Sequence, residues 1–165
     1  MNVKTLNTRQ AARGGMCEGK LNDSEDFNAG LVELSLKTFD PPHGEAYEML
    51  ARHRLPQDSA TKEIFLSFSK GATDGSYDLT PDQNTVRLTF VHNISETESL
   101  IYSQVSGKAE LKLDPNTGVF SGELKDAVVQ YREEETPVSL NINVRFEAIN
   151  KLVKYTTSHK SYRAA

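Results

Sequence analysis

His92 and Ser103 are the residues of this sequence whose types and spacing come nearest to catalytic chemistry. Both fall in stretches that alternate apolar and polar residues, and the alternation places both side chains on the inner side of neighbouring strands. A serine beside a histidine supplies two of the three groups of a nucleophilic triad. No G-x-S-x-G motif surrounds Ser103, and no acidic residue is placed to orient the imidazole. We therefore expect a histidine hydrogen-bonded to a hydroxyl, and an enzyme is the least favoured of three functional hypotheses.

Metal and cofactor chemistry has little support in the sequence. Asp74, Ser76 and Asp78 have the alternate spacing of a calcium loop, but Leu79 and Thr85 occupy the positions that require glycine and glutamate. A solvated turn is the favoured interpretation of this segment. The remaining histidines lack zinc-ligand spacing and there is no glycine-rich phosphate loop, so we expect no metal and no cofactor.

Four amphipathic segments between residues 85 and 152 form the scaffold that must position these side chains. Each alternates apolar and polar residues with a period of two, which is the pattern of a strand with one buried and one solvated side. Two further strands are predicted near residues 32–39 and 63–68. The sequence therefore predicts an all-β, antiparallel meander.

One short helix is predicted at residues 45–55. Ala46, Met49, Leu50 and His53 recur at spacings of three and four, and Pro56 follows directly.

The second and third amphipathic segments predict a bent sheet. A straight strand over residues 99–113 would span about 50 Å at about 3.3 Å per residue, so we expect a bend at Gly107. In the next segment the apolar parity changes between Leu124 and Ala127, which indicates a β-bulge with one extra residue. A meander of this kind folds into a β-sandwich or closes into a barrel, and the sandwich is slightly favoured.

A hairpin connects these two segments through a type I turn at residues 114–118, because Pro115 and Gly118 suit its backbone angles. If Asp114 faces Val119, then Leu113 faces Phe120 and Ala109 faces Leu124. This hairpin resembles those of many bacterial β-sandwich and barrel proteins, which is a structural likeness and identifies no family.

The chain divides into three zones by composition. Residues 1–29 are polar and predict a flexible N-terminal arm, residues 30–157 a single antiparallel β domain, and residues 158–165 a C-terminal tail. Cys17 lacks the upstream apolar stretch of a lipoprotein signal, and a single cysteine makes no internal disulfide. We expect a cytoplasmic protein. The formal net charge of -4 and the absence of a long apolar run disfavour nucleic-acid and membrane partners.

The polar outer side of the sheet is the predicted interaction surface. It comprises Tyr102, Gln104, Asn141, Asn143 and Arg145, together with the acidic loop residues Glu133, Glu134 and Glu135. Because catalytic motifs are missing, the leading hypothesis is a non-enzymatic interaction or structural β-module with a protein partner.

The alternative is a small-ligand-binding β-barrel with a lipocalin-like cavity for an apolar molecule. Its predicted lining is Phe90, Val105, Leu124, Val144 and Phe146. A homo-oligomer is compatible with either hypothesis, because unpaired edge strands can pair between copies.

Overall fold

The computed structural model describes residues 15–56, 60–133 and 135–149 of the 165-residue chain. These residues form ten β-strands and contain no helix, and so none that could cross a membrane. In chain order the strands are β1 (Gly15–Leu21), β2 (Glu25–Asn28), β3 (Leu31–Thr38), β4 (Glu45–Arg54), β5 (Thr61–Ser69), β6 (Gly75–Asp78), β7 (Val86–Asn93), β8 (Ser99–Asp114), β9 (Val119–Tyr131) and β10 (Val138–Ile149). The C-terminal tail expected from residue 158 lies outside the described residues.

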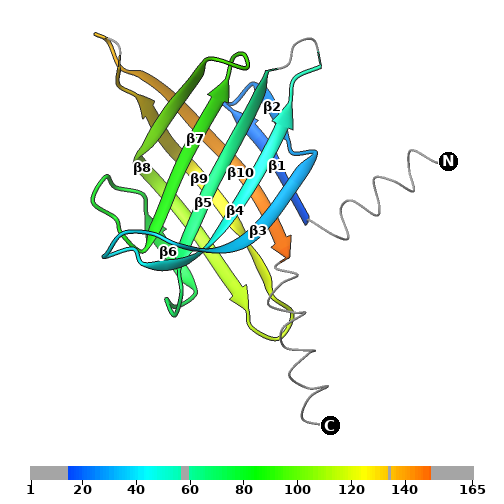
Figure 1. The fold of residues 1–165 in the computed structure, drawn as a ribbon, viewed down its shortest axis with the longest axis vertical. Coiled ribbons are helices and arrows are strands. Elements are labelled where there is room, and N and C mark those ends of the chain that lie inside the picture. Colours follow the sequence, from blue (N-terminus) through cyan, green and yellow to red (C-terminus); the bar gives the residue numbers. More distant parts are fainter. Residues whose placement is uncertain (1–14, 57–59, 134, 150–165) are drawn as a thin grey trace, which may run out of the picture.

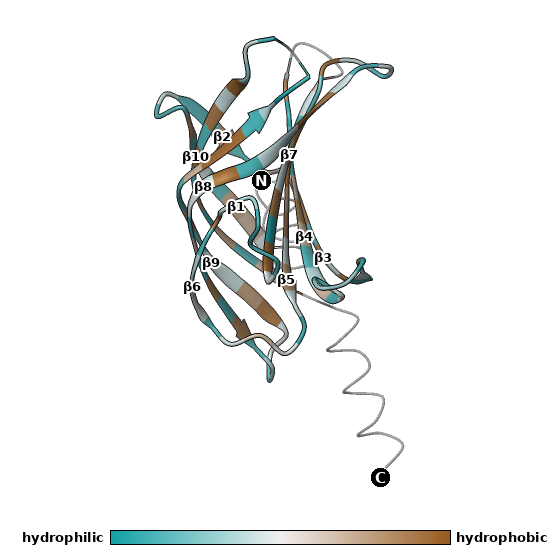
Figure 2. Ribbon diagram, turned by 90° about the vertical axis from the view of Figure 1, so that its left-hand side faces the viewer, coloured by the Kyte–Doolittle hydropathy of each residue, from teal (hydrophilic) through white to brown (hydrophobic). Residues whose placement is uncertain are grey.

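All strands belong to one antiparallel sheet that curls strongly into a half-barrel (Figure 1). The order is β2-β1-β10-β9-β8-β7-β5-β4-β3, and β6 pairs separately with β8. In side view, β8, β9 and β10 form one wall and β3, β4 and β5 the opposite wall (Figure 2). The predicted all-β antiparallel class is confirmed. Because the sheet is continuous from β2 to β3, its form is closer to the barrel than to two stacked sheets.

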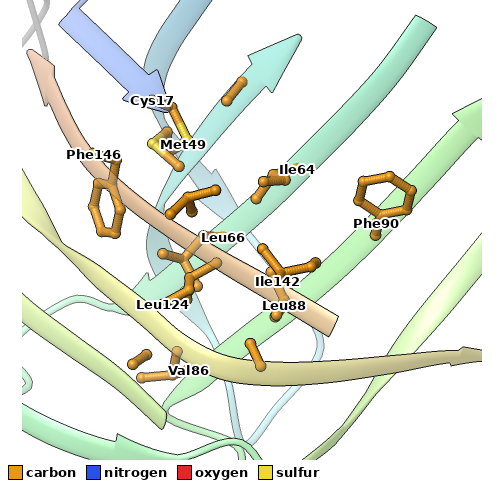
Figure 3. Close-up of a cluster of buried hydrophobic side chains, with 14 of the residues drawn as sticks. Cys17, Met49, Ile64, Leu66, Val86, Leu88, Phe90, Leu124, Ile142 and Phe146 are labelled. Carbon is orange, nitrogen blue, oxygen red and sulfur yellow. The ribbon is translucent and has the colours of Figure 1, made fainter. Parts of the chain in front are cut away.

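The core fills the concave side of the curl. Side chains from β1, β4, β5, β7, β9 and β10 converge there (Figure 3). Cys17, Met49, Ile64, Leu66, Leu124 and Ile142 are all at most 1% exposed. Burial of this apolar surface stabilises the curl without a continuous hydrogen-bonded closure between β2 and β3.

The predicted helix at residues 45–55 is wrong, because this segment forms β4. Met49 and Ala51 face the core opposite Leu66 and Ile64 of β5. The apolar residues of this segment recur at spacings of three and four because Leu50 is apolar although its side chain lies on the side of β4 that faces away from Met49 and Ala51. Pairing with β3 and β5 on both edges overrides the local helical pattern.

The sheet also extends into the zone that was expected to be a flexible arm. β1 pairs with β10 and β2 pairs with β1. Cys17, Leu21 and Phe27 are at most 1% exposed. The apolar alternation is hard to see because Gly19 occupies an inner position between Cys17 and Leu21, directly opposite Val144. Residues 15–28 therefore belong to the sheet, and the expected boundary near residue 30 lies inside it.

The hairpin between β8 and β9 has the predicted register. Asp114 faces Val119, Leu113 faces Phe120 and Ala109 faces Leu124. The Gly118 amide donates to the Asp114 carbonyl oxygen at 2.8 Å. The predicted bulge is present at Asp126, whose φ of 47° accompanies a shift in the pairing of β9 with β10.

A second irregularity in β8 was only half predicted. Gly107 adopts a φ of 98°, and the pairing with β9 shifts on both sides of Ser106. A Cβ atom on Gly107 would lie 2.2 Å from the Asp126 carbonyl oxygen, so the bend requires glycine. The expected bend is therefore present. It also changes the buried side of β8 from even-numbered residues before it to odd-numbered residues after it, whereas the sequence pattern suggested one parity throughout.

Candidate functional site

The structure does not bring His92 and Ser103 together. His92 faces Leu100, and Ser103 faces Thr89. His92 is half-buried on the concave side, while Ser103 is exposed on the convex side. The sequence pattern placed both side chains on the inner side of neighbouring strands, but the pairing of β7 with β8 separates them along the strands and β8 reverses parity, so a nucleophilic pair of these two residues is not formed.

His92 instead belongs to a row of basic side chains at the end of the curl where β4 and β7 finish. His53, Lys62 and His92 lie opposite one another on β4, β5 and β7. Burial lowers the pKa of His92, and the charge of Lys62 lowers it further against the opposing effect of Glu25. Lys62 pairs with Glu25 of β2, and the Asn28 amide donates to His53 Nδ1 at 2.8 Å. These contacts join β2 to the opposite wall of the curl.

A serine–histidine pair that the sequence did not suggest lies elsewhere. His43, in the β3–β4 loop, places Nε2 2.7 Å from Ser67 Oγ and Nδ1 2.5 Å from the Asn84 carbonyl oxygen. The carbonyl can only accept, so Nδ1 carries the proton and Nε2 accepts from the hydroxyl. Twenty-four positions separate His43 from Ser67, and no motif in the sequence links them.

The environment of this pair favours a structural role. His43 is 7% exposed and Ser67 is 2% exposed, so an incoming substrate has little access to the hydroxyl. Burial lowers the pKa of His43, and Ser69 Oγ donates to its carbonyl oxygen at 2.9 Å. The network anchors the β3–β4 loop on the outer side of β5.

Tyr102 and Gln104 were predicted on the outer surface, and the structure places them on the inner side. They are 8% and 2% exposed. Gln104 Oε1 accepts from the Leu88 amide at 2.6 Å, while Nε2 donates to the Thr80 carbonyl at 2.7 Å. The side chain thereby replaces backbone pairing where β8 turns away from β7 towards β6. The correction follows from the parity change at Gly107.

Asn141 and Asn143 line the outer side of β10 as predicted, but their amides are already used. Asn143 Oδ1 accepts from the Asp126 amide at 2.8 Å, and Asn143 Nδ2 donates to Asn141 Oδ1 at 2.7 Å. The backbone N–H of Asn141 donates to Asn22 Oδ1 at 2.9 Å. The Asn143 side chain thus supports the bulge of β9, and the Asn22 side chain fastens the turn between β1 and β2 to the backbone of β10.

The other predicted groups are dispersed. Glu133 and Glu135 are exposed in the β9–β10 loop, and Glu134 lies outside the described residues. Asp74 Oδ1 accepts from the Leu113 amide at 2.9 Å, and Ser76 and Asp78 lie on β6. Within the described ranges, no three His, Cys, Asp or Glu side chains are grouped so that they could hold a metal ion.

Four of the five residues predicted to line a ligand cavity belong to the contiguous core: Phe90, Leu124, Val144 and Phe146. Val105 is half-buried beside the bend of β8.

The convex side of β1, β10, β9 and β8 carries a continuous row of charged residues. Glu18 faces Arg145, Arg145 faces Glu123, and Glu123 faces Glu110. We call these four residues the outer ridge. Arg145 Nη2 lies 3.1 Å from Glu18 Oε1, and Lys125 Nζ lies 3.0 Å from Glu110 Oε1. Of the predicted surface residues, Arg145 is the one that this row includes.

Two grooves flank the outer ridge. The first, of about 580 Å³, crosses from β2 to β9 and is bordered by Asp26, Asn28, Lys125 and Asn143 beside the ridge. The second, of about 390 Å³, is bordered by Met16, Ser121 and Glu147. Glu123 and Arg145 line both. Sequence alternation indicates which residues share this side of the sheet. The ridge also depends on the register between β1 and β10, which brings together residues that are over 120 positions apart in the sequence.

Comparisons with protein-family models, with curated proteins and with solved structures find no match to this chain. The function is therefore inferred from the geometry of the site.

Proposed function

We propose that this protein is a non-enzymatic interaction module that binds a polypeptide partner through the outer ridge and its two grooves. The observation that carries the proposal is the groove pair itself, which offers a shallow surface of mixed polar and apolar character on both sides of one row of charged side chains. Functional sites are commonly built on surface concavities with convergent polar groups.

The charge arrangement of the ridge supports a cationic group on the partner. Glu123 and Glu110 lie directly opposite each other on neighbouring strands. Like charges in this arrangement destabilise a sheet. The described ion pairs of the ridge join Glu18 to Arg145 and Glu110 to Lys125, while Glu123 lies between Arg145 and Glu110. The pKa of Lys125 is raised mainly by its bond to Glu110 and also by the charge of Glu123, which is close to it. A lysine or arginine side chain of a partner placed beside Glu123 would add a further favourable charge interaction.

Photo-crosslinking tests this proposal. A photoreactive residue at Ser121, in the second groove, should capture a polypeptide from the source cell, whereas the same residue at the exposed loop position Thr97 should not. Capture of one polypeptide at both positions, or of none at Ser121, contradicts the proposal.

A matched pair of variants then tests the ridge with the captured polypeptide. Glu123→Gln should bind it several-fold more weakly and with less dependence on salt, because one charge–charge attraction is lost. Its fold should be about as stable as the wild type, since the substitution removes both the repulsion from Glu110 and the attraction to Arg145 and Lys125. Glu98→Gln, in the exposed β7–β8 loop, should bind as the wild type does. Equal affinity of Glu123→Gln and wild type would refute the role of the ridge.

A further inference from the structure

β3 is the terminal strand at one end of the sheet and has only one neighbour, β4. No other strand of the described residues pairs with its second edge. Ser35, Leu36, Lys37 and Thr38 are all exposed, and Leu36 is one of few large apolar side chains that are. The strand at the opposite end, β2, is only four residues long. Among the described residues β3 is therefore the longer of the two terminal strands, and we call its unpaired second edge the free edge, although β3 also contacts β1 and β10 across the curl.

The hydrogen-bonding phase shows which backbone groups face this free edge. The Lys70 amide donates to the Glu45 carbonyl, so Glu45 bonds to β5. In an antiparallel sheet the backbone N–H and C=O groups of successive residues point to opposite edges of the strand. The groups of Ala46 therefore bond to β3, and those of its partner Lys37 bond to β4. The Arg52 carbonyl, which like that of Ala46 belongs to an even-numbered residue of β4, also bonds on the β3 side, because it accepts from the Gly30 amide. The N–H and C=O groups of Val32, Leu34, Leu36 and Thr38 consequently point to the free edge.

Natural edge strands are commonly protected by a bulge, a proline or inward-facing charges. β3 contains no proline, and its register with β4 is regular over eight residues. Its lysine, Lys37, points to the convex side and lies 2.9 Å from Glu48 of β4. These features leave the edge competent to pair.

The sequence of β3 is complementary to itself about Ser35. In an antiparallel pair centred on this residue, Glu33 faces Lys37 of the second copy, and Lys37 faces its Glu33. Leu34 faces Leu36, so the exposed Leu36 gains an apolar neighbour. The backbone hydrogen-bonding pattern also fits this pairing. Leu34 and Leu36 of the two copies would form a hydrogen-bonded pair, whereas Glu33 and Lys37 would form the closer, non-hydrogen-bonded pair.

We infer that two copies of this chain associate through β3, antiparallel and centred on Ser35, and so join their sheets into one continuous sheet. The interface is isologous, as two-fold symmetry requires. It leaves the outer ridge free, since the ridge lies on β1, β10, β9 and β8.

Cysteine substitution tests the register. Ser35→Cys places two cysteines directly opposite each other at the two-fold axis, where a disulfide can form. Under mild oxidation we expect a covalent dimer. Glu33→Cys alone should not cross-link, because its counterpart would lie about 13 Å away at about 3.3 Å per residue. The combination Glu33→Cys with Lys37→Cys should cross-link again. The native Cys17 is 1% exposed and does not interfere.

Three further variants test the association without a covalent bond, with the mass in solution measured by analytical ultracentrifugation. Leu36→Pro removes an N–H that faces the free edge, so the monomer should fold and the dimer should be lost. Glu33→Lys should weaken the dimer by setting lysines opposite each other, and adding Lys37→Glu should restore it. A wild-type chain that is monomeric at every concentration, or a dimer that Leu36→Pro leaves intact, would overturn the inference.

Discussion

His43 makes stability depend on pH because it is buried in its neutral form. Burial is the main cause that lowers its pKa from 6.5, with the charge of Arg87 acting in the same direction. The bond to the Asn84 carbonyl and the charge of Glu48 act in the opposite direction without cancelling the shift. The unfolded chain therefore binds a proton more readily than the folded one. Stability from this group is present above about pH 6.5 and is lost as the pH falls through the lower pKa of the folded state.

We expect urea denaturation between pH 7.5 and 5 to show falling stability. His43→Gln should reduce the slope, whatever its effect on the stability at pH 7.5. His92, whose pKa is also lowered, contributes in the same direction, and the carboxyl groups with lowered pKa titrate below 3.8. The double variant with His92→Gln should be flatter than either single variant. A slope that both substitutions leave unchanged would contradict this origin.

Cys17 is predicted to be unreactive in the folded protein. Burial, together with the neighbouring charge of Glu18, raises the pKa of its thiol to about 12. Because the thiolate is the reactive form and the side chain is 1% exposed, maleimide should label it only when β1 opens. At pH 8 we expect slow labelling whose rate increases with urea, against rapid labelling of a Thr97→Cys thiol in the exposed β7–β8 loop. Equal rates would show that β1 is not held in the sheet.

Among the strands, β8 is held in place by a side chain where its backbone leaves β7. Gln104→Leu would leave the Leu88 amide and the Val86 carbonyl oxygen without the side chain that bonds them, whereas the Thr80 carbonyl oxygen would keep its bond from the Gln83 amide. One unsatisfied buried polar group costs roughly 1–3 kcal/mol. We therefore expect the free energy of unfolding to fall by at least about 2 kcal/mol. Gln104→Glu should also be destabilising, because a carboxylate cannot donate to the two carbonyls.

Gln130→Leu is the matched control for Gln104. Its amide makes an exposed bond of 3.0 Å to Ser139 Oγ, so the substitution should cost less than about 0.5 kcal/mol. Similar losses for the two leucine variants, measured by urea denaturation, would argue against the bridging role of Gln104.

The same strand shows what alternation can and cannot predict. The register of the β8–β9 hairpin follows from local turn chemistry, so Ala109 and Leu124 were paired correctly from the sequence. Tyr102 was misplaced because the irregularity around Ser106 depends on contact with Asp126 of another strand. β4 was misassigned for a related reason, since its neighbours and not its own residues select the strand. His43 and the outer ridge depend on contacts between distant segments, which a period-two pattern does not encode.

At the scale of the whole molecule, the two ends of the curled sheet meet through side chains. Phe27 of β2 is 1% exposed and lies with its ring centroid 5.5 Å from that of His53 on β4. The neighbouring pair of Glu25 and Lys62 joins the same walls, but the Glu25 side chain is 47% exposed. Exposed ion pairs contribute little to stability, whereas a buried aromatic ring contributes much more. Apolar packing is thus expected to dominate the closure of the curl.

This difference gives a prediction for the closure. Phe27→Ala should lower the free energy of unfolding by about 3–5 kcal/mol, and Glu25→Gln by less than about 1 kcal/mol. Hydrogen exchange should show the consequence locally, because the Asn28 amide, bonded to His53 Nδ1, depends on β2 remaining docked. We expect its protection to be lost in Phe27→Ala and retained in Glu25→Gln. If Glu25→Gln released this amide while Phe27→Ala did not, the ion pair and not the core would be closing the half-barrel.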